Sequence, residues 1–241
     1  MTERLTIGIV GCSAEGAALC YRTICTRGSA ALGPYEHPEI VMHTPSLARY
    51  VAALEVGDLE AVADLMLQSA HCLVAAGADF LICPDNTIHA AMPFVRARSP
   101  LPWLHIAEIV AAEAVRRGFR RAAVLGTRWL CDSSVYPDAL QSRGMEFLRP
   151  EPEERDEVGR IIMEELVNDV RRDQSVRYLQ TLIARMQERG CDTAILGCTE
   201  LPIVLDEANS ALPILDSTRL LADAALARAI MPGAEQTQAA T

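Results

Sequence analysis

A pattern that occurs twice in the sequence constrains the fold more than any other feature. Segments 77–87 and 190–200 both begin with Gly, have Asp at the third position, continue through an apolar run and leave it through small polar residues. In this alignment Asp85 occupies the position of Cys198. Two further pairs of segments match in the same order: 101–105 with 212–216, and 9–12 with 124–127. The chain is therefore predicted to contain two similar halves.

Each half alternates short apolar runs, typical of buried strands, with longer amphipathic or charged segments, typical of helices. Asp58 is a favourable N-cap for one such helix, and Gly77 is a favourable residue just after its end. Strands are expected at 5–11, 39–43, 80–83, 122–125 and 193–197, a loop at 28–38, and helices at 15–25, 58–76, 106–117, 153–171, 175–189 and 217–231. Alternation of this kind predicts parallel sheets with right-handed crossovers.

We therefore predict an α/β fold of two pseudo-symmetric lobes, each a parallel sheet flanked by helices. The N-terminal lobe would span residues 1–100, with the helix at about 217–231 packing back on it, and the C-terminal lobe 101–216. Residues 232–241 are predicted to be a disordered tail. Because open α/β sheets bind ligands beyond the carboxyl ends of their strands, the active site is expected in the cleft between the lobes.

The absence of lysine restricts the chemistry. All 22 basic residues are Arg, so neither a Schiff base to pyridoxal phosphate nor a Walker A loop can form. The eight Cys and five His include no CxxC motif and no zinc-finger spacing, so no metal is expected. The sequence therefore predicts an enzyme without a cofactor, in which side chains alone move protons.

Charge and hydropathy limit the partners. A formal net charge of −10 argues against nucleic acid. No apolar run is long enough to span a bilayer, and the first residues have no signal-peptide pattern. We expect a cytoplasmic protein that acts on a small amino acid or carboxylate, binds neither membrane nor nucleic acid, and forms a homodimer.

The polar residues after two of the expected strands are the candidate site. Segments 84–87 and 197–200 offer backbone N–H groups and hydroxyls that can hold a carboxylate without a positive charge. Inverting the carbon beside that carboxylate needs a base on one face and an acid on the other. Asp85 and Cys198, related by the repeat, are the candidate pair.

These residues also carry a resemblance to a known family. The matching pieces are 7–11 followed by Ser13 and Glu15, then Tyr21-Arg22, 76–79, Asn-Thr-x-His at 86–89, 101–105, 125–127, Gly-Cys-Thr-Glu at 197–200, and Leu215-Asp216. With them the chain resembles the aspartate/glutamate racemase superfamily over nearly its whole length. The resemblance implies a cofactor-independent amino-acid racemase with two facing acid–base groups, usually both Cys. The second Cys falls on Cys198, and Asp85 stands in place of the first.

The resemblance also bears on the substrate. Family members that act on aspartate hold its distal carboxylate with an Arg and a later Lys. Here the later position carries Val167, and the earlier one falls on Tyr50 or, with a shift of one residue, on Arg49. Strict specificity for aspartate is therefore not expected. The candidate substrate-binding residues are Ser13, Arg49, Asn86, Thr87, Thr127 and Thr199.

Structural interpretations compete with the functional ones. Cys198 could be a buried structural thiol, and Asp85 could cap the helix that follows it. His89 and His105 are interpreted as structural hydrogen-bond partners. Two other functional classes also remain: a related one-thiol decarboxylase or isomerase of small carboxylates, and a catalytically inactive ligand-binding homologue.

Overall fold

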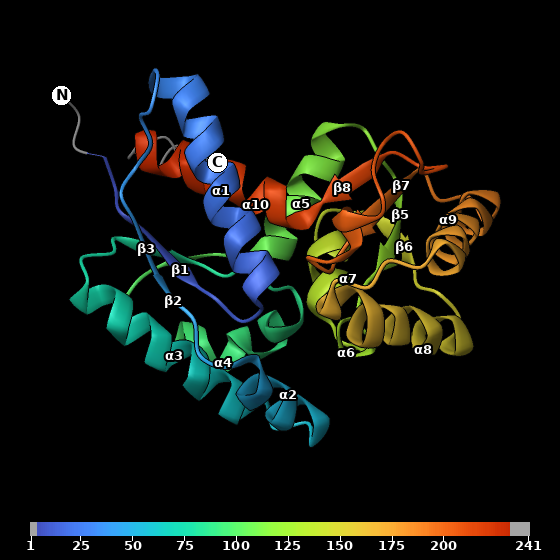
Figure 1. Ribbon diagram of the computed structural model, residues 1–241, viewed down its shortest axis with the longest axis horizontal. Helices are drawn as coiled ribbons and strands as arrows, with labels where there is room; N and C mark the ends of the chain where they lie inside the picture. Colours follow the sequence, from blue (N-terminus) through green and yellow to red (C-terminus); the bar gives the residue numbers. More distant parts are fainter. Residues whose placement is uncertain (1–3, 232–241) are drawn as a thin grey trace. The chain divides into compact units, whose positions relative to one another are not determined.

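The computed structural model describes residues 4–231 as two compact units, which Figure 1 shows as a ribbon. The first unit comprises the chain up to Pro84, Ala91–His105 and the residues from Thr218 onward. The second comprises Asp85–Ala90 and Ile106–Ser217. The tail predicted for 232–241 lies outside the described residues.

The first unit contains a four-stranded parallel sheet in the order β2-β1-β3-β4. Its strands are β1 (Ile7–Val10), β2 (Ile40–His43), β3 (Phe80–Ile82) and β4 (Trp103–Leu104). Its helices are α1 (Ala14–Leu32), α2 (Leu47–Glu55), α3 (Leu59–Ala75), α4 (Met92–Arg96) and, from Thr218, α10 (Ser217–Ile230). Because β4 pairs with β3, the segment 101–105, which we assigned to the second lobe, clusters with the first unit.

Two predicted boundaries in this unit have different outcomes. Asp58 caps α3 as expected, since its carboxylate accepts a hydrogen bond from the Ala61 amide at 2.9 Å. The loop expected at 28–38 is wrong in its first part, because α1 continues to Leu32. Gly28 lies inside that helix where the returning chain passes close by. A Cβ there would be 2.9 Å from the Cβ of His37. The glycine therefore serves close packing and does not end the helix.

The second unit repeats the architecture of the first. Its sheet is parallel and has the order β6-β5-β7-β8, so the strands of each unit run second, first, third, fourth. The strands are β5 (Arg121–Leu125), β6 (Glu146–Leu148), β7 (Thr193–Leu196) and β8 (Ile214–Asp216). The helices are α5 (Ile106–Arg116), α6 (Arg128–Asp132), α7 (Val135–Gln141), α8 (Pro152–Arg160) and α9 (Asp173–Glu188). The predicted pair of parallel-sheet lobes is confirmed.

Short helical turns complete the chain. They are the 3₁₀ turns Thr87–Ala91, Leu166–Asn168 and Leu201–Ile203, and the π-helix Ile161–Glu165. The single helix predicted for 153–171 is therefore wrong, because α8 ends at Arg160 and a π-turn follows. The wider turn accompanies the burial of Glu165, whose carboxylate accepts hydrogen bonds from the Ser175 hydroxyl and the Arg160 guanidinium, both at 2.7 Å.

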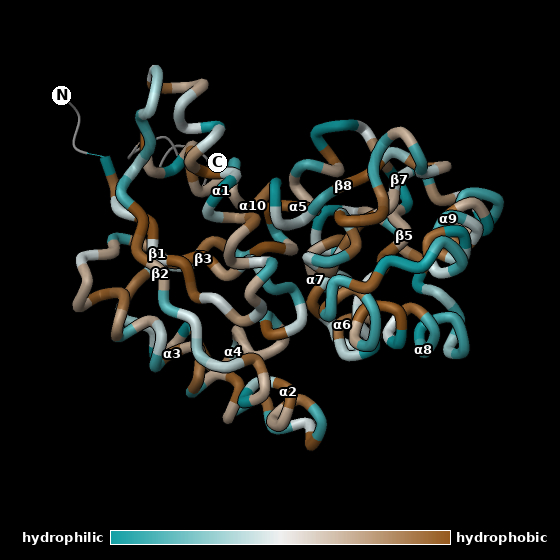
Figure 2. The backbone as a smooth tube through the Cα atoms, in the orientation of Figure 1, coloured by the Kyte–Doolittle hydropathy of each residue, from teal (hydrophilic) through white to brown (hydrophobic). Residues whose placement is uncertain are grey.

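The core of each unit lies along its central strands. Figure 2 shows hydrophobic colouring along β1 and β3, and hydrophilic colouring over much of α8. Every residue of β1, β3 and β7 is buried, in keeping with strands covered on both faces. None of the helices within residues 4–231 is long and apolar enough to cross a membrane.

Candidate active site

The end of β7 holds Cys198 in a crowded position. Gly197 extends the strand pairing, since its amide donates to the Leu125 carbonyl at 2.7 Å. A Cβ on Gly197 would lie 2.9 Å from that carbonyl oxygen and closer still to the Leu130 side chain. Only glycine fits, and the next residue, Cys198, is only 8% exposed. The sequence Gly-Cys thus fixes the thiol at the carboxyl end of a central strand.

Glu200 is the direct partner of the Cys198 thiol. The Sγ of Cys198 donates to Oε2 of Glu200 at 2.9 Å, and the hydroxyl of Thr199 donates to the same oxygen at 2.7 Å. Burial raises the pKa of the Cys198 thiol well above its ordinary value. The charges of Glu200 and, more weakly, of Asp85 act in the same direction. The thiol is therefore protonated at neutral pH and suited to donate a proton.

The segment Asp85–Ala90 belongs to the same unit as Cys198, although only two residues separate it from β3 of the other unit. Asp85 is half-buried, and Asn86 is 2% exposed. The side-chain amide of Asn86 accepts a hydrogen bond from the Tyr136 hydroxyl at 2.7 Å and donates one to the Ser217 hydroxyl at 2.9 Å. The residue beside Asp85 is thus fixed on both sides of its amide.

His89 holds this segment in place through its backbone. Nδ1 of His89 donates to the Asp85 carbonyl at 3.1 Å, and Nε2 accepts from the Ile106 amide at 3.4 Å. Because one ring nitrogen faces an acceptor and the other a donor, these contacts assign a neutral imidazole with the proton on Nδ1. His89 is a structural hydrogen-bond partner, as the sequence indicated.

Two threonines from different segments meet at the site. The hydroxyls of Thr87 and Thr127 lie 2.9 Å apart, and both side chains are buried. Thr127 also caps α6, because its hydroxyl accepts from the Leu130 amide at 3.2 Å. The contact between the two hydroxyls uses one of their two hydrogens. The other hydrogen can turn toward a bound anion.

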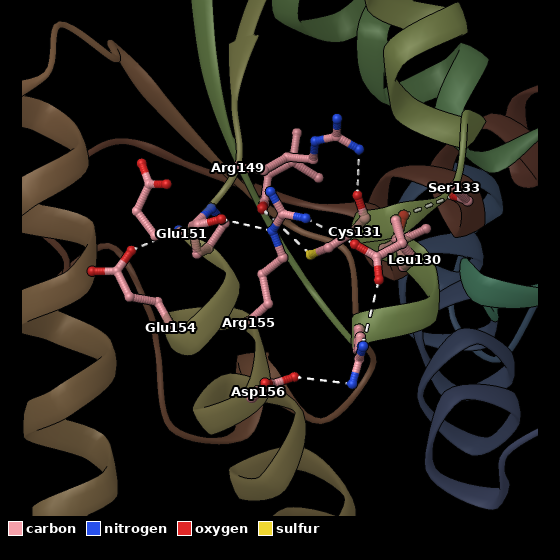
Figure 3. A network of polar contacts seen from close by, with 12 residues as sticks. Leu130, Cys131, Ser133, Arg149, Glu151, Glu154, Arg155 and Asp156 are labelled. Atoms are coloured by element: carbon pink, nitrogen blue, oxygen red, sulfur yellow. Dashed lines mark hydrogen bonds and ion pairs between the residues drawn. The ribbon is translucent and has the colours of Figure 1, made fainter. Parts of the chain in front are cut away.

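An arginine network holds α6, and with it Thr127, against α8 (Figure 3). Arg149 donates to the Cys131 carbonyl at 2.5 Å. Arg155 donates to the Pro150 carbonyl at 2.7 Å and to the Asp132 carboxylate at 2.8 Å. These charge-assisted contacts bind the carboxyl end of α6 and the start of α8 together.

Two of the predicted substrate-binding residues lie in the first unit. Ser13 is buried and caps α1, with its hydroxyl accepting from the Gly16 amide at 3.2 Å. Arg49 is exposed on α2, where it donates to Gln68 at 3.3 Å. It lines a surface cavity of about 330 Å³ together with Ala53, Ala61, Asp64, Leu65 and Gln68. The other six predicted residues, Asp85, Asn86, Thr87, Thr127, Cys198 and Thr199, all belong to the second unit.

Sequence reasoning missed three polar residues of this unit as members of the site. Glu200 ends the Gly-Cys-Thr-Glu motif, but the sequence does not show that its carboxylate binds the candidate thiol. Tyr136 and Ser217 were not singled out. Ser217 directly follows the matching Leu-Asp pair at 215–216, which was an available signal, whereas no local pattern marks Tyr136. Within residues 4–231, no group of three or more His, Cys, Asp or Glu side chains is arranged to hold a metal ion.

Comparison with known proteins gives a consistent family. A sequence model described as Asp/Glu/Hydantoin racemase matches residues 8–225. The broad specificity amino-acid racemase RacX of Bacillus subtilis is 28% identical over 153 residues, which are 62% of this chain and 64% of RacX. The chain thus aligns with somewhat less than two thirds of that relative's length.

Solved structures match over more of the chain. A candidate Asp/Glu racemase from Yersinia pestis has a TM-score of 0.86 and 28% identity, with 94% of this chain and 100% of that chain covered. An aspartate racemase homologue from Pyrococcus horikoshii has a TM-score of 0.81 and 26% identity, with coverage of 96% and 100%.

Proposed function

Because the chain belongs to the Asp/Glu/hydantoin racemase family, we propose that it is a cofactor-independent amino-acid racemase or epimerase. The proposed proton-transfer groups are Asp85 and Cys198. The family match confirms the resemblance that the sequence motifs indicated. The activity itself, its substrate and these residue roles are the proposal.

One observation carries the proposal: Asp85 and the buried Cys198 belong to the same compact unit, and the charge of Asp85 contributes to raising the pKa of the Cys198 thiol. The two groups therefore lie within electrostatic reach of each other in one unit. An ordinary aspartate is ionised at neutral pH. The resting pair is then an acceptor, the Asp85 carboxylate, and a donor, the Cys198 thiol.

In one direction, the Asp85 carboxylate removes the α-proton and the Cys198 thiol delivers its proton to the opposite face. The carbanion between these steps carries its charge on the substrate carboxylate, where the one hydroxyl hydrogen that the Thr87–Thr127 contact does not use can donate a hydrogen bond. The enzyme is left with a protonated Asp85 and a Cys198 thiolate. That form is the one required for the reverse direction, and exchange of both protons with water restores the resting form.

The side chain of the substrate is proposed to be small and uncharged. Val167 is 38% exposed and cannot pair with a distal carboxylate. The nearby cations Arg160 and Arg172 both face Glu165, at 2.7 and 3.5 Å. A second carboxylate on the substrate would therefore lack an uncommitted cationic partner in this segment.

The test is α-proton exchange in deuterated water with a panel of amino acids, followed by mass spectrometry and chiral separation. Deuterium at the α-carbon together with the opposite enantiomer supports racemisation, and neutral amino acids should compete with aspartate. Cys198→Ala should slow turnover about 10²–10⁴-fold, because positioned proton transfer contributes roughly that much. Asp85→Asn should abolish racemisation, with slow exchange at the Cys198 face only.

Cys191→Ala is the matched control, since Cys191 is also buried and precedes β7 at its opposite end. It should leave turnover unchanged. Absence of α-exchange with every amino acid in the panel would contradict the proposal. If the Asp85→Asn variant racemises as fast as the parent, Asp85 has only a structural role.

A one-thiol reaction is the second candidate, and the raised pKa of Cys198 favours it. A thiol held protonated beside Glu200 can protonate a carbanion without a second base. Such an enzyme would release carbon dioxide, or a product other than the enantiomer, from a small carboxylate. Product analysis in the same panel distinguishes the two reactions.

A further inference from the structure

Four buried polar groups form a continuous chain of hydrogen bonds beside the candidate pair. The Tyr136 hydroxyl donates to Oδ1 of Asn86 at 2.7 Å, and Nδ2 of Asn86 donates to the Ser217 hydroxyl at 2.9 Å. The Ser217 hydroxyl then donates to the Leu196 carbonyl at 2.8 Å. Tyr136 and Ser217 have no exposed surface, and Asn86 has 2%. We call this chain the Tyr136–Leu196 relay.

All hydrogen bonds of the relay point in one direction, from Tyr136 toward Leu196. The Leu196 carbonyl can only accept, so the Ser217 hydroxyl gives it its one hydrogen and must accept from Asn86. This requirement fixes the orientation of the Asn86 amide, whose oxygen then faces the Tyr136 hydroxyl. Burial raises the pKa of Tyr136, so the phenol remains a donor throughout the working pH range. Donors aligned in one sense strengthen one another at low dielectric.

Two members of the relay lie next to the two proton-transfer groups in the sequence. Asn86 is the residue after Asp85, and Leu196 is two residues before Cys198. The Tyr136 ring also packs against the strand exit, since a Cβ on Gly197 would lie 3.3 Å from its Cε2. A single side chain on α7 thus fills the space beside Gly197 and holds the amide beside Asp85.

On the premise of the proposed function, we propose that Tyr136 and Ser217 are positioning residues that fix the separation between the Asp85 carboxylate and the Cys198 thiol. Neither needs to contact the substrate. A two-base reaction requires both groups within reach of one α-carbon, and displacing a reacting group by about 1 Å can cost roughly a hundred-fold in rate. The relay joins the two short segments that carry these groups.

Tyr136→Phe tests the relay most directly, because it removes one oxygen and keeps the ring against Gly197. We expect kcat to fall about ten- to a hundred-fold while KM changes less than about three-fold. Ser217→Ala should have a similar effect. The double variant should be little worse than either single one, because both break the same chain. Tyr178→Phe, in a partly buried tyrosine of α9 outside the relay, should be unchanged.

A second measurement separates positioning from general packing and does not require activity. Hydrogen exchange with mass spectrometry on the folded variants should show faster amide exchange at both 85–90 and 197–200 in Tyr136→Phe. Faster exchange confined to α7 would make Tyr136 a packing residue and overturn the proposal, as would an unchanged kcat. If the parent exchanges no substrate α-proton, the proposed racemisation fails, and amide exchange at the two segments still decides whether the relay joins them.

Discussion

Burial of Cys198 in the second unit, the carboxylate of Glu200 and the charge of Asp85 disfavour the thiolate and together outweigh the backbone amide of Glu200, which favours it. A thiolate is the form that abstracts a proton or reacts with an alkylating agent. Proton donation is therefore the easier task for this thiol and abstraction the harder one. The two directions of the proposed racemisation should consequently have different pH dependences.

Glu200→Gln should lower the pKa of Cys198, because it removes the nearest negative charge and keeps a side chain of the same size. The pH at which Cys198 is half-alkylated by iodoacetamide should shift downward, followed by mass spectrometry of the peptide that contains Cys198. The direction that starts from the thiolate should gain activity at neutral pH. Glu188→Gln, at the exposed end of α9, is the control and should leave the alkylation curve in place. An unshifted curve in Glu200→Gln would show that burial alone sets the acidity of this thiol.

Single residues also show where sequence reasoning reaches its limit. Cys198 and Asp85 could be selected because the repeat and the family motifs mark their positions. Tyr136 could not be selected, because its hydroxyl binds Asn86, which is 50 residues away in the sequence. No motif around either residue indicates this contact. Glu200 was visible in the motif, but only the fold shows that its oxygen accepts from both Cys198 and Thr199.

Among the elements, the π-helix Ile161–Glu165 is the one that departs most from local expectation. The charged pattern from 153 onward is typical of one long surface helix. The π-turn instead turns Glu165 inward, where it is 1% exposed, and π-turns occur often at functional sites. Its neighbours Ile161, Ile162 and Leu166 belong to the same hydrophobic cluster as Cys198. The turn thus contributes to the apolar surroundings that keep the thiol protonated.

Glu165→Gln should destabilise the second unit by about 1–3 kcal/mol at neutral pH, because a buried charged hydrogen-bond acceptor is lost. The Ser175 hydroxyl and then Arg160 lower the pKa of Glu165. The stabilisation is therefore fully present above the ordinary glutamate pKa of about 4.3 and is lost as the pH falls. Urea unfolding at pH 7 and pH 4 should show a difference between parent and variant that shrinks at pH 4.

Glu164→Gln is the matched control for this prediction, since its side chain is 69% exposed and 3.8 Å from Arg160. It should change the free energy of unfolding by less than about 0.5 kcal/mol. Equal effects of the two substitutions would show that the buried carboxylate has no special contribution.

Elements that obey local rules were predictable, and those that depend on distant partners were not. The strands at 80–82 and 193–196 are apolar runs ended by Pro or Gly, and α3 carries its own cap. β4 and β8 have only two or three residues, and their pairing with β3 and β7 defines them as strands. α6 and α7 are short and follow each other closely, so neither spans enough turns to show a periodic pattern.

For the whole molecule, the equal strand order of the two sheets agrees with the two similar halves that the internal repeat predicted. The chain nevertheless does not divide once between two halves. The first unit is completed by α10, far along the chain from β1. The Leu5 amide donates to the Ala229 carbonyl at 3.0 Å, and the Arg228 guanidinium lies 5.1 Å from the centre of the Phe80 ring. Leu221, Ala222, Ala225 and Ala229 of α10 are almost fully buried.

A chain ending at Ser217 should therefore lose the fold of its first unit and keep that of the second. Removing the buried face of α10 exposes several apolar side chains, each worth up to about 3 kcal/mol, against the small net stability of a domain. Amide exchange should become fast in β1–β4 and stay slow in β5–β8. Arg27→Gln, which breaks only the exposed ion pair with Asp223, should keep both sheets protected. Slow exchange in β1–β4 of the shortened chain would show that the first unit does not need α10.

The position of α10 in the chain also orders events during synthesis. Residues emerge from a ribosome in sequence order, and domains generally fold as units while they emerge. The second unit has all of its segments once Ser217 has been made, whereas the first unit still lacks α10 at that moment. More than a hundred residues are synthesised between the end of β4 and the start of α10. During that time the surface of β1–β4 that α10 covers in the folded protein is exposed. The half of the polypeptide that is translated first is the half that is completed last, and it is there that a nascent chain would need the protection of a chaperone.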